Sequence, residues 1–222
     1  MAGMRQFSTE QCFDMLTSLA FREIGDVRRN RAMFCVQLCL GCRVNEMLKL
    51  TLHEVLDGKG HIRDSWTFIK TKNGKNRTVK VLNRLVFDFL PDWLERLAEL
   101  GYTDIDDPLF PGRNGEKGIS DRQVRKIYAA AIEELGLDGR YSTHSCRKTW
   151  ACQTFDYLND QLRRGANISP LDELANLGGW DSVDAARRYI ADHISRAAES
   201  QQAIYSDLRE LVKIWKNEFR KL

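Results

Sequence analysis

Residues 27–50 read VRRNRAMFCVQLCLGCRVNEMLKL and carry the clearest structural signal in the chain. Apolar side chains cover much of the circumference of a helix from Val27 to Leu40, so this helix is predicted to be buried. Gly41 is expected to end it, because glycine readily adopts the left-handed conformation that closes many helices. A second short helix is expected over residues 44–50. This stretch therefore predicts a helical core that is interrupted at Gly41.

Working outward, the spacing of apolar residues changes once from a helical to an extended period. Residues 61–69 alternate in the manner of a strand, and Thr78, Val79 and Val81 predict a second one. Asn73-Gly74 between them is a strong signal for a tight hairpin turn. Elsewhere the spacing is helical, at residues 8–19, 86–97, 120–135, 143–151, 170–179, 183–190 and 197–219. The predicted fold class is α+β, mainly helical, with a small antiparallel β-sheet.

The composition is that of an ordinary globular protein. Hydrophobic residues make up 43% and charged residues 29% of the 222 residues, which excludes collagen-like and disordered chains. No apolar run approaches the roughly 18 residues that a membrane span requires. No secretory leader opens the chain, so a cytoplasmic location is expected, with no membrane association. The six cysteines are then expected to be reduced rather than paired in disulfides.

Three of these cysteines, Cys35, Cys39 and Cys42, have the spacing of a cluster-binding loop. The same spacing occurs in radical S-adenosylmethionine enzymes, in which three thiolates hold an iron–sulfur cluster. An iron–sulfur enzyme is therefore one alternative for this chain. We favour buried structural thiols, because the spacing puts all three on one face of a helix and free cysteine packs as a small hydrophobe. We accordingly expect no metal and no other cofactor.

A second set of residues is scattered along the chain and combines arginine, lysine, histidine and tyrosine in a fixed order. The set consists of Gly41-x-Arg43-x-x-Glu46, Thr71-Lys72-x-Gly74-Lys75-x-Arg77, Leu109-Phe110-Pro111, His144-x-x-Arg147-Lys148, Leu177-Gly178-x-Trp180 and Tyr189. Taken in this order, from about Phe7 to Ser195, these residues resemble the catalytic domain of the tyrosine recombinases, the phage integrase family. The resemblance implies an enzyme that cleaves and rejoins DNA strands at specific sites.

The resemblance also implies the nucleophile and the residues that stabilise the phosphate. Tyr189 would attack phosphorus and form a covalent 3′-phosphotyrosine intermediate. Arg43 and Arg147 would bind the phosphate oxygens with guanidinium groups that are always charged. Glu46 would support this site as a carboxylate that orients an arginine.

Three further residues match positions that handle protons or donate hydrogen bonds. Lys72 would protonate the departing 5′-oxygen. His144 would contact the phosphate and take the tyrosine proton. Trp180 would donate its indole N–H, which cannot act as a base. The rival tyrosines, Tyr141 and Tyr157, do not follow a Gly-Trp element at the required distance.

The distribution of charge supports double-stranded DNA as the partner, although the net charge is only +3. Residues 59–80 contain seven Lys or Arg and one Asp, whereas residues 81–110 contain two Arg and seven acidic residues. A basic hairpin of this kind fits contact with phosphates. The expected DNA contacts are Lys70, Lys75, Arg77 and Lys148. An association with the nucleoid follows from this partner.

The resemblance covers one domain where most of this family has two. We expect residues 1–222 to form a single catalytic domain, with a core of about 7–195 and a helical tail of about 197–222. The N-terminal domain that clamps DNA is expected to be absent. The tail would dock on a neighbouring protomer of a tetramer on DNA, or on its own protomer. The other alternative is a catalytically silent relative that binds DNA and regulates.

Overall fold

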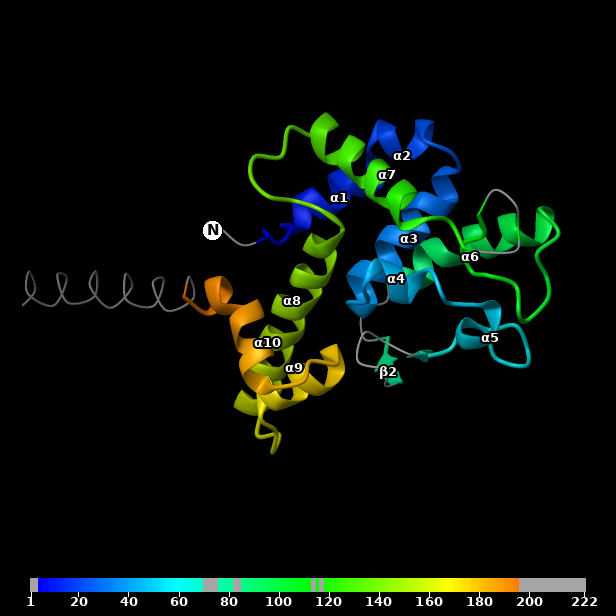
Figure 1. Ribbon diagram of the computed structural model, residues 1–222. Helices are drawn as coiled ribbons and strands as arrows, with labels where there is room; N and C mark the ends of the chain where they lie inside the picture. Colours follow the sequence, from blue (N-terminus) through cyan, green and yellow to red (C-terminus); the bar gives the residue numbers. More distant parts are fainter. Residues whose placement is uncertain (1–3, 70–75, 82–84, 113–114, 116–117, 196–222) are drawn as a thin grey trace, which may run out of the picture.

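A computed structural model describes residues 4–69, 76–81, 85–112, 115 and 118–195 of the chain (Figure 1). In its first part, five helices precede a two-stranded antiparallel sheet. They are α1 (Thr9–Thr17), α2 (Leu19–Glu23), α3 (Val27–Leu40), α4 (Val44–Met47) and α5 (Leu52–Val55), followed by strands β1 (Ser65–Phe68) and β2 (Arg77–Lys80). Up to residue 195, the described part of the chain then forms five more helices, namely α6 (Leu85–Glu99), α7 (Asp121–Glu134), α8 (Thr143–Arg163), α9 (Pro170–Gly178) and α10 (Val183–Tyr189). The predicted mainly helical α+β fold is confirmed.

Helix α3 lies at the centre of the larger part of the molecule, where it packs against α6 and α8 (Figure 1). Asp26 caps its first turn by accepting from the backbone N–H groups of Arg28 and Arg29. Gly41 ends it in the left-handed region, at φ +58°. The prediction for residues 27–40 is therefore confirmed. The helix that follows is shorter than predicted, since α4 ends at Met47.

The sheet is a single antiparallel pair, in which Trp66 lies opposite Val79 and Phe68 lies opposite Arg77. The alternation along β2 buries Arg77 and Val79 and exposes the two residues between and after them. The first strand begins at Ser65, four residues later than the alternating pattern suggested. The predicted turn at Asn73-Gly74 lies outside the described residues.

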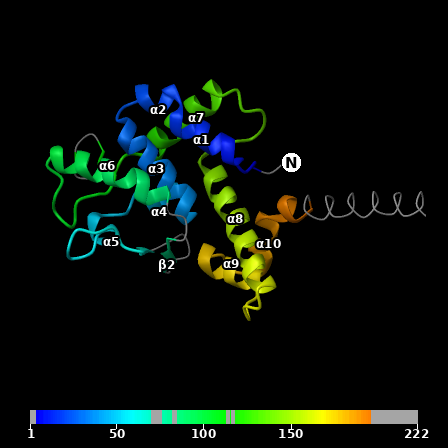
Figure 2. The same cartoon turned by 180° about the vertical axis from the view of Figure 1, so that it is seen from behind.

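Buried apolar residues form two clusters that share α8. The larger cluster fills the space among α1 to α7 and takes in the beginning of α8. The smaller cluster holds α9 and α10 against the rest of α8, through Trp150, Leu158, Leu174 and Ile190. Figures 1 and 2 show α8 running from one group of helices to the other. Gly41 lies where the clusters meet, directly against the ring of Trp150.

Among the helices that the structure describes, none combines the length and the apolar character needed to cross a membrane. This agrees with the hydropathy of the sequence.

Replacing Gly41 with alanine is expected to destabilise the fold by more than the cost of placing alanine in a left-handed backbone conformation. A Cβ at this position would lie 2.2 Å from Trp150, so the ring would have to shift. Left-handed backbone costs an L-residue about 1–2 kcal/mol, and overpacking adds about 1–3 kcal/mol. The measurement is the free energy of unfolding in urea.

Gly136→Ala is the matched control. Gly136 has nearly the same φ, +57°, but a Cβ there would meet nothing within 4 Å. It should therefore lose only the conformational part. Equal losses in the two variants would show that the contact with Trp150 does not constrain the junction.

Candidate active site

The candidate site begins where α3 ends and α4 starts. Arg43 is the N-cap residue of α4, and Glu46, three residues on, accepts its backbone N–H at 2.9 Å. The Arg43 guanidinium also donates to Glu46, with Nη1 and Oε1 2.6 Å apart. Glu46 is only 6% exposed. These contacts are those that a carboxylate needs in order to orient an arginine.

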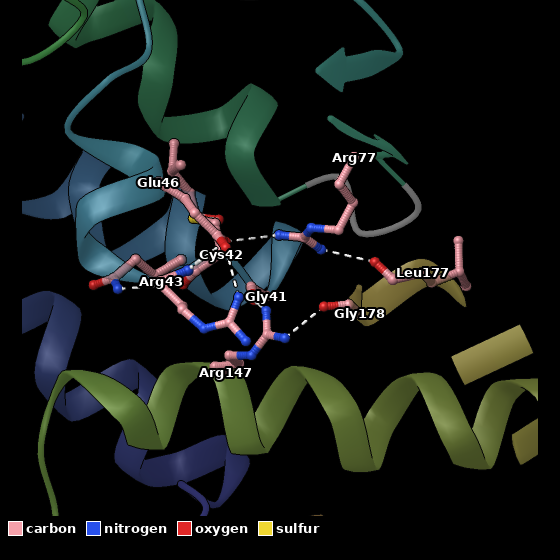
Figure 3. A network of polar contacts seen from close by, with 10 residues as sticks. Gly41, Cys42, Arg43, Glu46, Arg77, Arg147, Leu177 and Gly178 are labelled. Atoms are coloured by element: carbon pink, nitrogen blue, oxygen red, sulfur yellow. Dashed lines mark hydrogen bonds and ion pairs between the residues drawn. The ribbon is translucent and has the colours of Figure 1, made fainter. Parts of the chain in front are cut away.

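Arg77 reaches the same carboxylate from strand β2 (Figure 3). Its Nη2 donates to Glu46 Oε2 at 3.0 Å, and its Nη1 donates to the backbone carbonyl of Leu177 at 2.7 Å. The side chain is 7% exposed and stacks over the ring of Phe68, 4.8 Å from its centroid. The sequence predicts Arg77 as a DNA contact; in the structure its guanidinium is paired inside the site. The reason is the burial of one face of the hairpin, on which Arg77 lies.

Arg147 enters the site from α8 and is 2% exposed. Its guanidinium donates to the backbone carbonyls of Gly41 and Gly178, the latter at 2.5 Å, and lies over the ring of Trp180 at 4.6 Å (Figure 3). Burial lowers its pKa to about 10, and the positive charges of Arg43 and Arg77 act in the same direction. A pKa of about 10 still leaves Arg147 charged at neutral pH.

Tyr189 lies at the end of α10, beside this arginine and Trp180. Its ring centroid is 5.2 Å from that of Trp180, and its hydroxyl donates to the backbone carbonyl of His144 at 3.5 Å. Burial raises the pKa of the phenol, while Arg147 and Arg43 oppose that rise. The phenol is therefore protonated in the free protein, and the positive charges of Arg147 and Arg43 favour the phenolate.

His144 occupies the first turn of α8, where its backbone N–H donates to Ser142 Oγ at 3.1 Å. Desolvation lowers the pKa of the imidazole, and Arg125, Arg147 and Arg43 lower it further. The neutral form, which can accept a proton, is thus favoured. A cavity of about 80 Å³ lies beside it, lined in part by Arg43, Asn45 and Arg125.

Lys148 does not lie on the surface either. It is buried, and its Nζ forms an ion pair with Asp192 at 2.9 Å. The predicted contact between Lys148 and DNA stays a prediction. The pair ties the residues after Tyr189 to α8, and His193, 2.8 Å from Asp156, adds a second tie between the same segments.

Lys70, Lys72 and Lys75 lie outside the described residues. Their predicted roles, as general acid and as DNA contacts, stay predictions.

The cysteines favour the structural interpretation over an iron–sulfur site. Cys35 and Cys39 lie on α3 inside the apolar core, and Cys42 is fully buried behind Arg43. Burial raises the pKa of Cys35 well above its usual range and those of Cys39 and Cys42 to about 12. Thiolates, which ligate iron, are therefore disfavoured. Within the described part of the chain, no group of three or more His, Cys, Asp or Glu residues is arranged to hold a metal ion.

The sequence did contain a signal for the buried position of Arg77. Strand residues two apart share a face, so Arg77 belongs with Val79, and Val79 is a core residue. The partners of Arg77 had no comparable signal, because Leu177 lies one hundred residues away and offers only its backbone carbonyl.

Comparison with known proteins agrees with this geometry. The model of the phage integrase family matches residues 19–196. Tyrosine recombinase XerD of Pseudomonas putida is 28% identical over 179 residues, which cover 78% of this chain and 52% of that protein. Tyrosine recombinase XerC of Halalkalibacterium halodurans is 28% identical over 151 residues, or 66% of this chain and 45% of that protein. The chain thus spans about half the length of these two relatives.

Solved structures show the same fold. The XerA recombinase superposes with a TM-score of 0.64 at 18% identity, covering 91% of this chain and 66% of that one. The XerH site-specific recombinase, bound to its palindromic difH substrate after cleavage, gives a TM-score of 0.61 at 20% identity, covering 89% and 52%.

Glu46→Gln is expected to lose about 3–5 kcal/mol of stability at pH 7, because removing one partner of a buried ion pair leaves charge uncompensated. Burial raises the pKa of Glu46, but the Arg43 backbone N–H, Arg77 and the Arg43 side chain together lower it below the ordinary value for a glutamate. A lowered folded pKa gives stability that is present above about pH 4.5 and is lost as pH falls through the folded value. The difference between wild type and variant should shrink in that range, as measured by urea unfolding.

Glu54→Gln is the matched control, since Glu54 accepts the backbone N–H of Thr51 in the same kind of capping box, at 2.8 Å, and has no arginine partner among the described residues. Its loss should be about 1 kcal/mol, as for a helix cap. A wild-type advantage over Glu46→Gln that stayed constant into strong acid would contradict the role assigned to the Glu46 charge.

Proposed function

The chain belongs to the phage integrase family, and on that premise we propose that it cleaves and rejoins strands of double-stranded DNA in site-specific recombination. The reaction proceeds through a covalent 3′-phosphotyrosine intermediate on Tyr189. The observation that carries the proposal is the stack in which Arg147 lies over Trp180 and Trp180 lies against Tyr189. It brings a phosphate-binding group and a nucleophile together from two helices.

The chemistry follows from the residue types. The Tyr189 oxygen attacks phosphorus, the bond from phosphorus to the 5′-oxygen breaks, and His144 accepts the phenolic proton. Lys72 supplies a proton to the departing 5′-oxygen. Arg43 and Arg147 neutralise the charge that develops on the non-bridging oxygens, assisted by the indole N–H of Trp180. Rejoining is the reverse reaction, in which a 5′-hydroxyl attacks the phosphotyrosine.

The free protein is not primed for attack. The raised pKa of Tyr189 keeps the phenol protonated, and its hydroxyl donates a hydrogen bond to the backbone carbonyl of His144. Arg147 likewise donates two hydrogen bonds to backbone carbonyls. Its remaining N–H groups are those available to a phosphate. Binding of DNA must therefore bring the phosphate to the arginines before the phenol loses its proton.

The remaining parts of the proposal concern domain organisation and partners. Residues 1–222 form one catalytic domain, with a core of about 7–195. The protein assembles as a tetramer on DNA. Its tail, residues 197–222, lies outside the described residues and docks either on a neighbouring protomer or on its own protomer. Its location is cytoplasmic, in association with the nucleoid. A silent relative would bind DNA without forming any covalent product.

Covalent trapping tests the proposal. The protein is incubated with a library of nicked duplexes randomised around the nick, denatured, and separated by electrophoresis. Wild-type protein should yield DNA-linked protein, because the short strand released beside the nick diffuses away and prevents rejoining. Tyr189→Phe should yield none while still binding the selected duplex, since it lacks only the hydroxyl.

Tyr157→Phe is the control, because Tyr157 is 48% exposed on α8 and belongs to no part of the proposed site. It should form adduct at the wild-type rate. An adduct that persists in Tyr189→Phe overturns the choice of nucleophile, and binding without any adduct in wild type favours the silent relative.

Binding of the selected duplex should weaken as salt increases, because phosphate contacts release counterions. Lys75→Gln is expected to lower the slope of log affinity against log salt by about 1. Arg28→Gln, which removes a charge already within 4 Å of Glu95 and Glu99, should leave the slope unchanged. The measurement is fluorescence anisotropy across a salt series, and equal slopes in Lys75→Gln and wild type would remove this lysine from the DNA contacts.

A further inference from the structure

We propose that Arg77 is a positioning residue that sets the distance between Arg43 and Arg147, the two arginines that bind phosphate. The proposal rests on the function proposed above. The two Nη groups of Arg77 donate to Glu46 and to the carbonyl of Leu177, so its effect on the phosphate is indirect. It acts through one carboxylate and one helix end.

The first connection runs through Glu46. Its Oε2 accepts both the backbone N–H of Arg43, at 2.9 Å, and Nη2 of Arg77, at 3.0 Å. Its Oε1 accepts the Arg43 side chain at 2.6 Å. The position of Arg77 therefore determines where the carboxylate lies, and the carboxylate determines where the Arg43 guanidinium points (Figure 3).

The second connection runs through the end of α9. Arg77 Nη1 donates to the carbonyl of Leu177 at 2.7 Å, and Arg147 Nη2 donates to the next carbonyl, that of Gly178, at 2.5 Å. Carbonyls in the last turn of a helix lack partners within the helix and carry its partial negative charge. Two arginines from different elements thus hold consecutive carbonyls of one turn. Displacing Arg77 would free this turn, and Arg147 with it.

The position requires the planar fork of arginine. One Nη group donates to Glu46 and the other to Leu177, which a single ammonium nitrogen cannot reproduce. The side chain passes over the Phe68 ring and past Gly179, where a Cβ would lie 2.8 Å from Arg77 Cδ. The absence of a side chain at Gly179 therefore leaves the path that Arg77 occupies.

Electrostatics explain why the connection has to be complete. Burial lowers the pKa of Arg77 and the Glu46 carboxylate opposes that effect, whereas Arg43 adds repulsion. Arg147 is affected by the charges of both other arginines. Among these three guanidiniums, Arg43 and Arg77 therefore share one carboxylate, while Arg147 is held by backbone carbonyls. If Arg77 lost its hydrogen bonds to Glu46 and Leu177, this repulsion would move Arg43 and Arg147 relative to each other.

The test compares Arg77→Lys with wild type on the selected nicked duplex. The rate of adduct formation should fall about 100-fold, the scale expected when catalytic groups are displaced by about 1 Å, with DNA affinity and the circular dichroism spectrum retained. Arg96→Lys is the matched control, since Arg96 also donates to two partners, Asp26 and Glu99, but far along α6. It should keep the wild-type rate.

Two modified duplexes separate positioning of the arginines from other effects. A methylphosphonate at the cleaved position removes the charge that Arg43 and Arg147 neutralise, so the deficit of Arg77→Lys should shrink there. A 5′-bridging sulfur makes the leaving group independent of a general acid, and the deficit should persist there. A deficit cured by sulfur alone would mean that Arg77 acts on proton donation, and an equal deficit on all three duplexes would mean a purely structural role; either result overturns the proposal.

A readout without DNA keeps this inference distinct from the proposed function. The Nε–Hε resonances of Arg43 and Arg147, observed in ¹⁵N-labelled protein, should shift in Arg77→Lys and stay in place in Arg96→Lys. Unmoved resonances would overturn the positioning role even if wild type forms adduct. Shifted resonances together with no wild-type adduct would leave the arrangement of arginines correct and the proposed function wrong.

Discussion

The buried carboxylate of Glu46 is the contact on which the site depends. Three guanidiniums, from the start of α4, from β2 and from α8, lie close enough to repel one another. A charge that has left water is stable only when it is paired and hydrogen-bonded. Glu46 meets this requirement for Arg43 and Arg77 directly, and backbone carbonyls meet it for Arg147. The chain thus concentrates positive charge where a phosphate can replace the repulsion with attraction.

The arrangement of helices explains how such a site holds together. Helix α8 belongs to both apolar clusters, and Arg147 leaves it near the place where they meet. The smaller cluster carries α9 and α10, which bring the carbonyls of Leu177 and Gly178 and the ring of Tyr189. Arg77 and Arg147 therefore form polar contacts across the junction of the two clusters. Apolar packing alone would fix the relative position of the clusters less precisely.

Much of the fold was predictable from local pattern, and the exceptions have physical causes. The bounds of α3 followed from its apolar residues and from Gly41, because helix caps and periodicity are local properties. The same holds for α9, which runs from Pro170 to the two glycines that end it. The burial of Arg77 and Lys148, both predicted as DNA contacts, was not foreseen, because a charged residue usually lies at the surface and their partners, Glu46 and Asp192, are distant in sequence. The roles of Lys70, Lys72 and Lys75 stay predictions.

By itself the sequence determined the chemistry that the chain can offer: a tyrosine, a histidine, two arginines and a tryptophan in the order of a known family. It determined this because the types of these residues and their order along the chain can be read without knowing which residues are in contact. Only the tertiary structure decided which charged groups are buried and paired within the candidate site. The physical reason is that burial and pairing depend on residues far apart in the chain, as with Glu46, Arg77 and Leu177.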